Sequence, residues 1–221
     1  MSSTAAGGTG RVDRTAPFIV FEGGEGGGKT TQAALLRERL ADRVGIEAIV
    51  TRQPGGTAIG ARLRSILLDV DNAELSDRCE ALLMAADRAQ HATELIGPTL
   101  ASGVGVICDR YLYSSVAYQG YGRGLDAQKV AEISEWATAA LLPDLVVLID
   151  VDLDTASGRL QRELDRFEQA GADFHERVRR GFLAQANEDP SRWVVIDGSR
   201  SIDEVAEQIW DAVARLPMVT Q

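Results

Sequence analysis

The chain has little cysteine and no long apolar run. Its 221 residues include two cysteines, Cys79 and Cys108, which share no metal-ligand spacing and which we interpret as buried free thiols. No apolar run approaches the ~18 residues that span a bilayer. The N-terminus also lacks a charged region followed by an apolar one. We therefore expect a cytoplasmic protein with no membrane partner.

Positive charge is also scarce. The chain has 23 lysines and arginines against 33 acidic residues, which gives a net charge of −10 and a pI near 4.7. This balance argues against a nucleic-acid polymer as partner, because binding to a phosphate backbone requires a basic surface. Small anions remain possible ligands where a few arginines gather locally.

What the chain does contain is enough apolar sequence for one core. With 45% hydrophobic and 25% charged residues, a chain of this length favours a single α/β domain. Residues 1–16 are small, polar and rich in glycine, and we expect a disordered N-terminal extension there. The single domain is expected to cover 17–217.

A glycine-rich segment follows the first apolar run. Gly23 is followed, after four residues, by Gly28, Lys29 and Thr30, the GxxxxGK[ST] spacing of a phosphate-binding P-loop between a strand and a helix. Glycines let successive N–H groups point at an anion, and the helix that starts near Lys29 adds its positive end. Lys29 would reach the β- and γ-phosphates, and Thr30 would ligate Mg²⁺. A merely flexible turn is the alternative.

Five apolar, β-rich runs alternate with helical patterns along the chain. Their ranges are 18–22, 47–52, 104–109, 145–151 and 193–197. Continuous apolar strands separated by helices specify a parallel sheet covered on both faces. We predict an α/β fold, in which a five-stranded parallel sheet flanked by helices forms a P-loop NTPase-type three-layer sandwich with a small lid. Ligands bind beyond the carboxyl ends of such strands.

Two of those strand ends carry arginine. Arg52 ends the second run and faces the predicted crevice, which makes it a candidate phosphate clamp. Asp109 and Arg110 end the third run. The carboxylate is placed to hold Mg²⁺, and the guanidinium can bind a phosphate through two N–H groups. A surface ion pair is the alternative. The tyrosines, serines and amide of 111–124 suit recognition of a base and sugar, with aromatic packing as the rival interpretation.

Residues 74–101 predict one long helix. Its expected core stripe consists of Leu82, Ala85, Ala86 and Ala89. Another face carries Met84, Arg88, His91 and Leu95. Arg88 could contact a base or a phosphate from that face. His91 is interpreted as a neutral packing or capping residue, because no nucleophile or carboxylate accompanies it.

Three arginines follow the fourth apolar run at i, i+3 and i+7, namely Arg159, Arg162 and Arg166. On a helix they would form one basic face. A mobile lid over approximately 157–170 would then bring them to a transferring phosphoryl group and exclude water. A solvated helix whose arginines pair with Glu163 and Asp165 is the alternative.

Six motifs occur in the order and with the spacing of those in bacterial thymidylate kinases: GGEGGGKTT, TRQPGGT, ALLMAADRAQH, DRYLYSSVAYQGYGRG, PDLVVLIDV and ELDRFE. The chain resembles that family over nearly its whole length after residue 17, and the DRY and DRFE motifs are far more specific than the P-loop. The resemblance implies a nucleoside monophosphate kinase, usually a homodimer, that makes dTDP from dTMP with ATP and Mg²⁺ in dTTP synthesis.

The resemblance also implies roles for individual residues. ATP would be bound by Gly23, Gly24, Glu25, Gly26, Gly27, Gly28, Lys29, Thr30 and Thr31. The acceptor dTMP would be bound by Arg52, Met84, Arg88, Asp109, Arg110, Ser115, Tyr118 and Gln119. Catalytic roles would fall to Lys29, Glu25, Arg159, Arg162 and Arg166, and the metal would lie at Thr30 and Asp109. An acidic residue in the P-loop together with an arginine-bearing lid is similar to the bacterial subtype.

Two positions depart from the family pattern. Gln53 stands where the family turn usually has glutamate, which removes a negative charge beside Arg52. Met84 stands where the family usually has a phenylalanine stacked on the thymine. Methionine fills an apolar slot but has no π-face. Both changes leave the fold and reaction class intact, and substrate affinity is the property that they would alter.

Other functions compete with this interpretation. A kinase for another nucleoside monophosphate or small metabolite belongs to the same class. A GTPase-type switch is less well supported, because the chain contains no Asn-Lys-x-Asp sequence for guanine recognition. An ATP-driven nucleic-acid motor is disfavoured by the acidic balance and the single-domain length.

Overall fold

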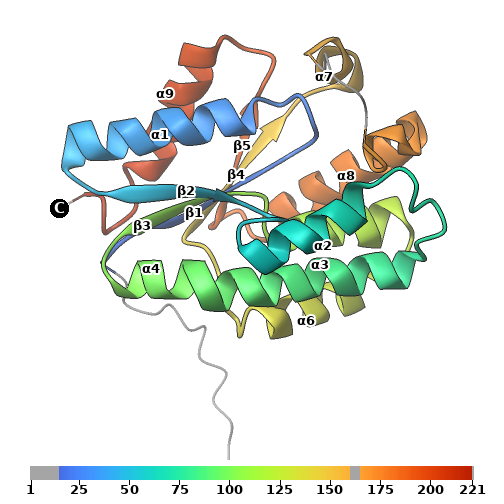
Figure 1. The fold of residues 1–221 in the computed structure, drawn as a ribbon. Helices are drawn as coiled ribbons and strands as arrows, with labels where there is room; N and C mark the ends of the chain where they lie inside the picture. Colours follow the sequence, from blue (N-terminus) through green and yellow to red (C-terminus); the bar gives the residue numbers. More distant parts are fainter. Residues whose placement is uncertain (1–14, 160–164, 221) are drawn as a thin grey trace, which may run out of the picture.

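The computed structural model describes residues 15–159 and 165–220. Within these residues, five parallel strands form one sheet in the order β2-β3-β1-β4-β5 (Figure 1). The strands are β1 (Phe18–Glu22), β2 (Ala48–Arg52), β3 (Gly105–Asp109), β4 (Leu145–Asp150) and β5 (Trp193–Asp197). Every strand lies within one residue of its predicted range, so the predicted parallel sheet is confirmed.

Helices cover both faces of this sheet (Figure 1). One face carries α1 (Lys29–Val44) and α9 (Ile202–Val213). The other carries α2 (Ala58–Leu68), α3 (Asp77–His91), α4 (Gly97–Ala101), α6 (Ala127–Ala137) and α8 (Ala172–Glu188). Shorter elements are the π-helical turns η1 (Ala92–Ile96) and η2 (Val116–Gly122), α5 (Leu112–Ser115), α7 (Leu153–Arg159) and the 3-10 turn η3 (Glu168–Ala170). The result is the predicted three-layer arrangement.

Strand β1 shows why the sheet needs helices on both faces. Its side chains alternate, so that Phe18 and Val20 pack into the core beneath α8, while Ile19 and Phe21 pack into the core beneath α1 and α9. At the start of β1, the backbone N–H of Phe18 donates to the buried Asp144 carboxylate at 2.8 Å. A cavity lies at the opposite, carboxyl end of the sheet, where Arg52 and Asp109 line it.

The helix predicted for 74–101 is continuous through α3, η1 and α4, beginning after Ser76, whose hydroxyl accepts from the Cys79 N–H at 3.4 Å. Its predicted core stripe is wrong at two positions, because Leu82 is 57% exposed and Ala86 is exposed as well, whereas Ala85 is buried as predicted. Besides Ala85, the buried face of α3 carries Glu80, Asp87, Arg88 and His91. Polar side chains can be buried on that face because they form hydrogen bonds or ion pairs there. Hydrophobic periodicity cannot predict such partners.

The predicted domain limits need small corrections. Of the extension expected at 1–16, residues 1–14 lie outside the described part, but Ala16 is buried. The domain also continues past 217, since Val219 is buried. Cys108 is buried as predicted, whereas Cys79 is exposed. Within the described residues, the helices are all too short or too polar to cross a membrane.

Candidate active site

The P-loop joins β1 to α1 and surrounds the Lys29 ammonium. Gly23 has φ +129°, and a Cβ there would meet the carbonyl oxygen of Ile149 on the neighbouring strand, so glycine is required. Lys29 is 5% exposed and donates to the carbonyls of Gly24 at 2.6 Å and Gly23 at 3.2 Å. Burial, followed by the nearby Arg110 charge, lowers the pKa of Lys29. A phosphate would supply the counter-charge that this ammonium needs.

The start of α1 is open to an anion. Its first residue follows Gly28, and within the described residues no side chain caps the first turn. The backbone N–H groups of that turn are left for a ligand, and the helix dipole favours a negative one. Of the residues predicted to bind ATP, 25–31 line a cavity of about 1050 Å³, and the Gly23 and Gly24 carbonyls hold Lys29 beside it.

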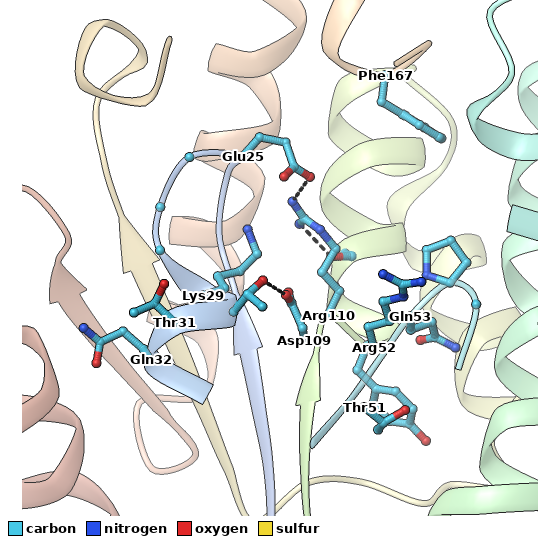
Figure 2. A pocket seen from close by; sticks show the side chains of 18 of the residues that line it. Glu25, Lys29, Thr31, Gln32, Thr51, Arg52, Gln53, Asp109, Arg110 and Phe167 are labelled. Carbon is cyan, nitrogen blue, oxygen red and sulfur yellow. Dashed lines mark hydrogen bonds and ion pairs between the residues drawn. The ribbon is translucent and has the colours of Figure 1, made fainter. Parts of the chain in front are cut away.

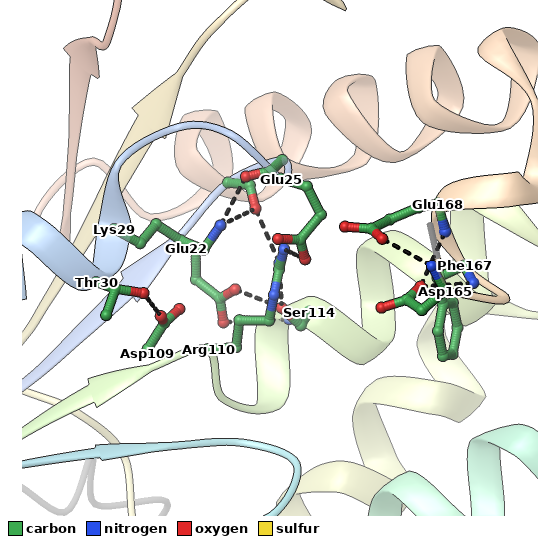
Figure 3. Close-up of polar contacts among 12 residues, drawn as sticks. Glu22, Glu25, Lys29, Thr30, Asp109, Arg110, Ser114, Asp165, Phe167 and Glu168 are labelled. Atoms are coloured by element: carbon green, nitrogen blue, oxygen red, sulfur yellow. Dashed lines mark hydrogen bonds and ion pairs between the residues drawn. The ribbon is translucent and has the colours of Figure 1, made fainter. Parts of the chain in front are cut away.

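Thr30 and Asp109 lie together at the ends of two neighbouring elements. The Thr30 hydroxyl donates to Asp109 Oδ2 at 2.9 Å (Figure 3). Because Phe21 of β1 pairs with Asp109 of β3, the sheet register brings the carboxylate beneath the P-loop. One hydroxyl and one carboxylate, beside a place for phosphates, suit Mg²⁺, which usually keeps waters and takes few protein ligands. The residues at the predicted metal site therefore fit that ion.

Arg110 reaches from β3 to the P-loop. Its guanidinium donates to the Gly23 carbonyl at 2.8 Å and pairs with Glu25 Oε1 at 2.6 Å (Figures 2 and 3). It also lies 5.1 Å from the centre of the Tyr118 ring. The backbone of Arg110 has φ +68°, an uncommon conformation for a residue with a side chain. Arg110 is therefore held inside the crevice, and the alternative of a surface ion pair with Asp109 is not what the structure contains.

Glu22 is a site residue that the sequence prediction missed. Its carboxylate is fully buried below Arg110, where it accepts the backbone N–H groups of Tyr111 at 2.9 Å and Ser114 at 3.2 Å, and the Ser114 hydroxyl at 2.5 Å (Figure 3). Burial raises the pKa of Glu22 to about 7, against the opposing effect of Arg110. The available signal was an acid at the end of an otherwise apolar strand.

The far wall of the cavity comes from β2, α2, α3 and η2. Every residue predicted to hold dTMP lines this cavity, namely Arg52, Met84, Arg88, Asp109, Arg110, Ser115, Tyr118 and Gln119. Arg88 is 1% exposed, and its guanidinium donates to Gln53 Oε1 at 3.0 Å, Ser134 Oγ at 3.0 Å and Ser115 Oγ at 2.8 Å. Arg52, by contrast, is exposed at the end of β2. The wall thus combines a fixed arginine with a freer one.

The structure changes the interpretation of Gln53. We predicted that it removes a charge beside Arg52, but its side chain is 3% exposed and contacts Arg88 instead. The turn is folded back on α3, where the Gly55 N–H donates to Asp87 Oδ1 at 2.9 Å. Gln53 therefore gives Arg88 a neutral acceptor. His91, close by, contacts the Thr51 hydroxyl at 2.8 Å, and burial lowers its pKa to about 4, as expected for a neutral packing histidine.

Two of the predicted lid arginines, Arg159 and Arg166, do not share one helical face. Arg159, the last residue of α7, donates to the carbonyls of Gly198 at 3.1 Å and Gly26 at 3.3 Å and lines the cavity. Arg162 lies outside the described residues. The prediction for Arg166 is wrong in placement, because it lies in a turn and not on that helix, and it pairs with the buried Glu80 at 2.7 Å. Its guanidinium contacts the Leu67 carbonyl and Glu80, and Arg166 is not among the described residues that line the cavity.

Sequence reasoning also missed part of the cavity wall. Arg64 of α2 lines it and donates to the Pro54 carbonyl at 3.0 Å. Asp165 and Phe167 also line it, from the start of the second described stretch of the chain. An arginine in a helix of mixed exposure carries no signal of its own, since the fold alone decides which way it points.

Three features surround one cavity: a phosphate-binding loop after β1, a carboxylate at the end of the adjacent β3, and a wall lined by arginines. Together they define the P-loop class of nucleotide-dependent phosphotransferases. A family model for thymidylate kinase matches residues 21–209. The chain belongs to the thymidylate kinase family.

Individual relatives agree with this assignment. The chain is 50% identical over 198 residues to the thymidylate kinase of Clavibacter michiganensis, covering 88% of this chain and 93% of that one. It is 46% identical over 200 residues to the thymidylate kinase of Desulforudis audaxviator, covering 90% of each. Its fold is similar to the crystal structure of thymidylate kinase from Ehrlichia chaffeensis, with a TM-score of 0.73 and 33% identity over 90% of this chain and 98% of that one.

Proposed function

We propose that this cavity transfers the γ-phosphoryl group of ATP to dTMP, giving dTDP and ADP. The observation that carries the proposal is that one cavity of about 1050 Å³ is lined by both the P-loop and the arginine-bearing wall. The P-loop provides a donor site for a polyphosphate. Arg88, Ser115 and Gln119 on the opposite wall offer hydrogen-bonding groups to a base, and Arg52 and Arg110 offer charge to its phosphate.

The chain's contribution to the reaction is positioning and charge neutralisation. The acceptor is a phosphate monoester dianion, which is already nucleophilic at neutral pH, so no strong general base is required. Lys29 would stabilise the charge on the transferring phosphoryl group from the P-loop side, and Arg159 would do so from the end of α7. Arg110 would hold the acceptor phosphate in line, oriented by its contact with Glu25.

Thr30 and Asp109 would hold Mg²⁺ together with the ATP phosphates, as their 2.9 Å contact at the mouth of the P-loop supports. A bound Mg²⁺ would offset negative charge on the phosphate oxygens. The residues between 157 and 170 are proposed as a lid over the phosphates. We also propose that the enzyme works in the cytoplasm, where ATP is available, and that its single catalytic domain extends from Ala16 to Val219, slightly beyond the predicted range of 17–217.

One assay tests the proposed reaction. We expect ATP consumption by the purified chain to depend on dTMP and on Mg²⁺, with each other nucleoside monophosphate as a much poorer acceptor. ATP with no acceptor is the control. Rapid ATP hydrolysis in that control, or a clear preference for dCMP or AMP, would contradict the proposal.

A homodimer is proposed as the working form. Exposed apolar side chains gather on α2, α3 and α6, which lie side by side on one face (Figure 1). Ile59 and Ile66 lie on α2, Val70 follows its end, Leu82 lies on α3 and Trp136 on α6. These side chains are between 43% and 83% exposed. Exposed apolar side chains on neighbouring helices are typical of a protein interface, and a symmetric dimer would cover them in both copies at once.

A further inference from the structure

Glu80, which has no part in the proposed reaction, has an unusual position for an acidic side chain. It is fully buried in the first turns of α3, behind the cavity wall. Its carboxylate meets Arg123 at 3.1 Å and Arg166 at 2.7 Å, and it accepts the side-chain N–H of Gln119 at 2.9 Å. Burying a carboxylate costs several kcal/mol unless charged partners surround it. Two guanidinium groups supply that compensation here.

The carboxylate decides which way the Gln119 amide faces. An ionised carboxylate accepts hydrogen bonds and donates none, whereas an amide has a donor end and an acceptor end. With Glu80 on one side, the Gln119 nitrogen must face it and the oxygen must face away. In agreement, Gln119 Oε1 is buried and has no hydrogen-bond partner among the residues that the structure describes. Gln119 itself lines the cavity and is 1% exposed.

A buried acceptor that finds no partner in the protein is stabilised by an outside donor, and an N–H group of a ligand in the cavity can be that donor. A pyrimidine with a carbonyl group at C4 carries a hydrogen on N3, whereas a pyrimidine with an amino group at C4 has a bare acceptor there. Arg88 on the same wall has only donors, which suits ring carbonyl oxygens. The exposed edge of a 4-oxo pyrimidine therefore matches this wall, and that of a 4-amino pyrimidine places acceptor against acceptor.

We propose that Glu80 is a specificity-determining positioning residue, which orients the Gln119 amide so that its oxygen accepts the N3–H of a 4-oxo pyrimidine. The inference rests on the proposed function and extends it, because it assigns base selection to a residue that does not touch the substrate. Replacing Glu80 by glutamine supplies both a donor and an acceptor. The Gln119 amide could then turn over and present its N–H to the ring.

The test compares kcat/KM for dTMP, dUMP and dCMP in the full chain and its variants. Glu80→Gln should lower the ratio of kcat/KM for dTMP over dCMP by about tenfold or more, mainly through a higher KM for dTMP, with the KM for ATP little changed. The response to dUMP, which keeps N3–H, should follow that to dTMP. Glu80→Asp keeps an acceptor-only group and should retain most of the discrimination, which a purely structural role would not predict.

Asp144→Asn is the matched control, since Asp144 is another buried carboxylate, bound to the Phe18 N–H at the opposite end of the sheet. It should lower stability without changing the dTMP to dCMP ratio. A folded Glu80→Gln variant with the ratio of the unmodified chain would overturn the inference. If that variant does not fold, Gln119→Leu is measured in its place. An unchanged ratio of kcat/KM for dTMP over dCMP in Gln119→Leu would also overturn the inference.

The two proposals fail in different ways. If the unmodified chain does not phosphorylate dTMP, the proposed function fails before any variant is measured. If it does so with strong preference over dCMP, and neither Glu80→Gln nor Gln119→Leu alters that preference, the function stands and the role of Glu80 is wrong.

Discussion

At the scale of single residues, the candidate base pocket is held by buried polar contacts and one soft apolar side chain. Arg88 is fixed by Gln53, Ser134 and Ser115 before any ligand arrives. Such pre-ordering reduces the conformational entropy that binding would otherwise cost. Met84 lies one helical turn before Arg88 and lines the same cavity. We propose that it contacts the flat face of a base.

Met84 provides the first prediction at this scale. Met84→Ala should weaken dTMP binding by up to about tenfold, because a sulfur–aromatic contact is worth about 0.3–1.5 kcal/mol. Met84→Phe should bind dTMP equally well or up to roughly tenfold more tightly, since a ring can stack on the base. ATP affinity should not change, because the P-loop lies across the cavity. Titration of both ligands by calorimetry measures this, and unchanged dTMP affinity in the alanine variant would make Met84 a packing residue only.

Glu22 provides a prediction about pH. Its pKa is about 7 in the folded chain, above the ordinary value of 4.5, so the folded state binds the extra proton between these values. Stability contributed by protonated Glu22 is therefore complete below pH 4.5 and is lost as pH rises to about 7. Glu22→Gln removes this titration. The free energy of unfolding of the unmodified chain, minus that of the variant, should fall by on the order of 3 kcal/mol across that window.

Denaturant titrations at a series of pH values measure that difference. His91, whose pKa is lowered to about 4, changes stability with pH in the opposite direction, but it is present in both proteins and cancels. A difference that stays flat from pH 4.5 to 7 would show that Glu22 titrates at its ordinary pKa.

At the scale of elements, the segment after β4 has two described parts with different partners. Helix α7 ends in Arg159, beside the P-loop and Gly198. The turn at Arg166 is fixed on the other wall, where Arg166 donates to the Leu67 carbonyl at 2.9 Å and pairs with Glu80. Arg159 therefore lines the cavity and Arg166 does not, although the two arginines are close in sequence.

This division predicts different results for two matched variants. Arg159→Ala should lower kcat by about 10²-fold with little change in stability or in dTMP affinity, because its charge would act on the transferring phosphoryl group. Arg166→Ala should instead lower the free energy of unfolding by about 3 kcal/mol, because it removes one partner of a buried carboxylate. Steady-state kinetics and thermal unfolding of both variants measure this. If Arg166→Ala lowered kcat as much as Arg159→Ala does and left the free energy of unfolding unchanged, Arg166 would have the catalytic role that the sequence predicted.

At the scale of the whole molecule, the face formed by α2, α3 and α6 sets the expected assembly. Leu82 on α3 is 57% exposed and Trp136 on α6 is 83% exposed, although both are large apolar side chains. The same helices carry Met84, Arg88 and Ser134 on or next to the candidate base pocket. Pairing of two copies through this face would stabilise the helices that carry the pocket wall.

The dimer predicts the effect of a single surface charge. Leu82→Glu should convert the chain to a monomer, because an unpaired carboxylate would be buried in the interface. Val195→Glu is the control, since Val195 is 48% exposed on β5, at the edge of the sheet farthest from β2. Size-exclusion chromatography with light scattering reports the mass of each. A monomeric unmodified chain, or a dimer that survives Leu82→Glu, would contradict the proposed interface.

The sequence by itself determined the sheet and the phosphate loop. Strands such as 18–22 and 193–197 could be predicted because a short, continuous apolar run rich in β-forming residues is typical of a buried parallel strand. The phosphate-binding role of residues Gly23 to Thr30 could be predicted because it depends on the spacing of these residues along the chain. Arg52, Asp109 and Arg110 line one cavity because the carboxyl ends of parallel strands meet at one edge of the sheet.

Only the tertiary structure decided the roles of buried charges. Nothing local distinguishes Arg159 from Arg166, yet one lines the cavity and the other meets Glu80, because the partner lies far away in sequence on α3. Likewise, Leu82 is exposed and Glu80 is buried, although hydrophobicity predicts the opposite. Periodicity reports which side chains prefer to leave water. Which polar side chains can be buried depends on partners that only the folded chain brings together.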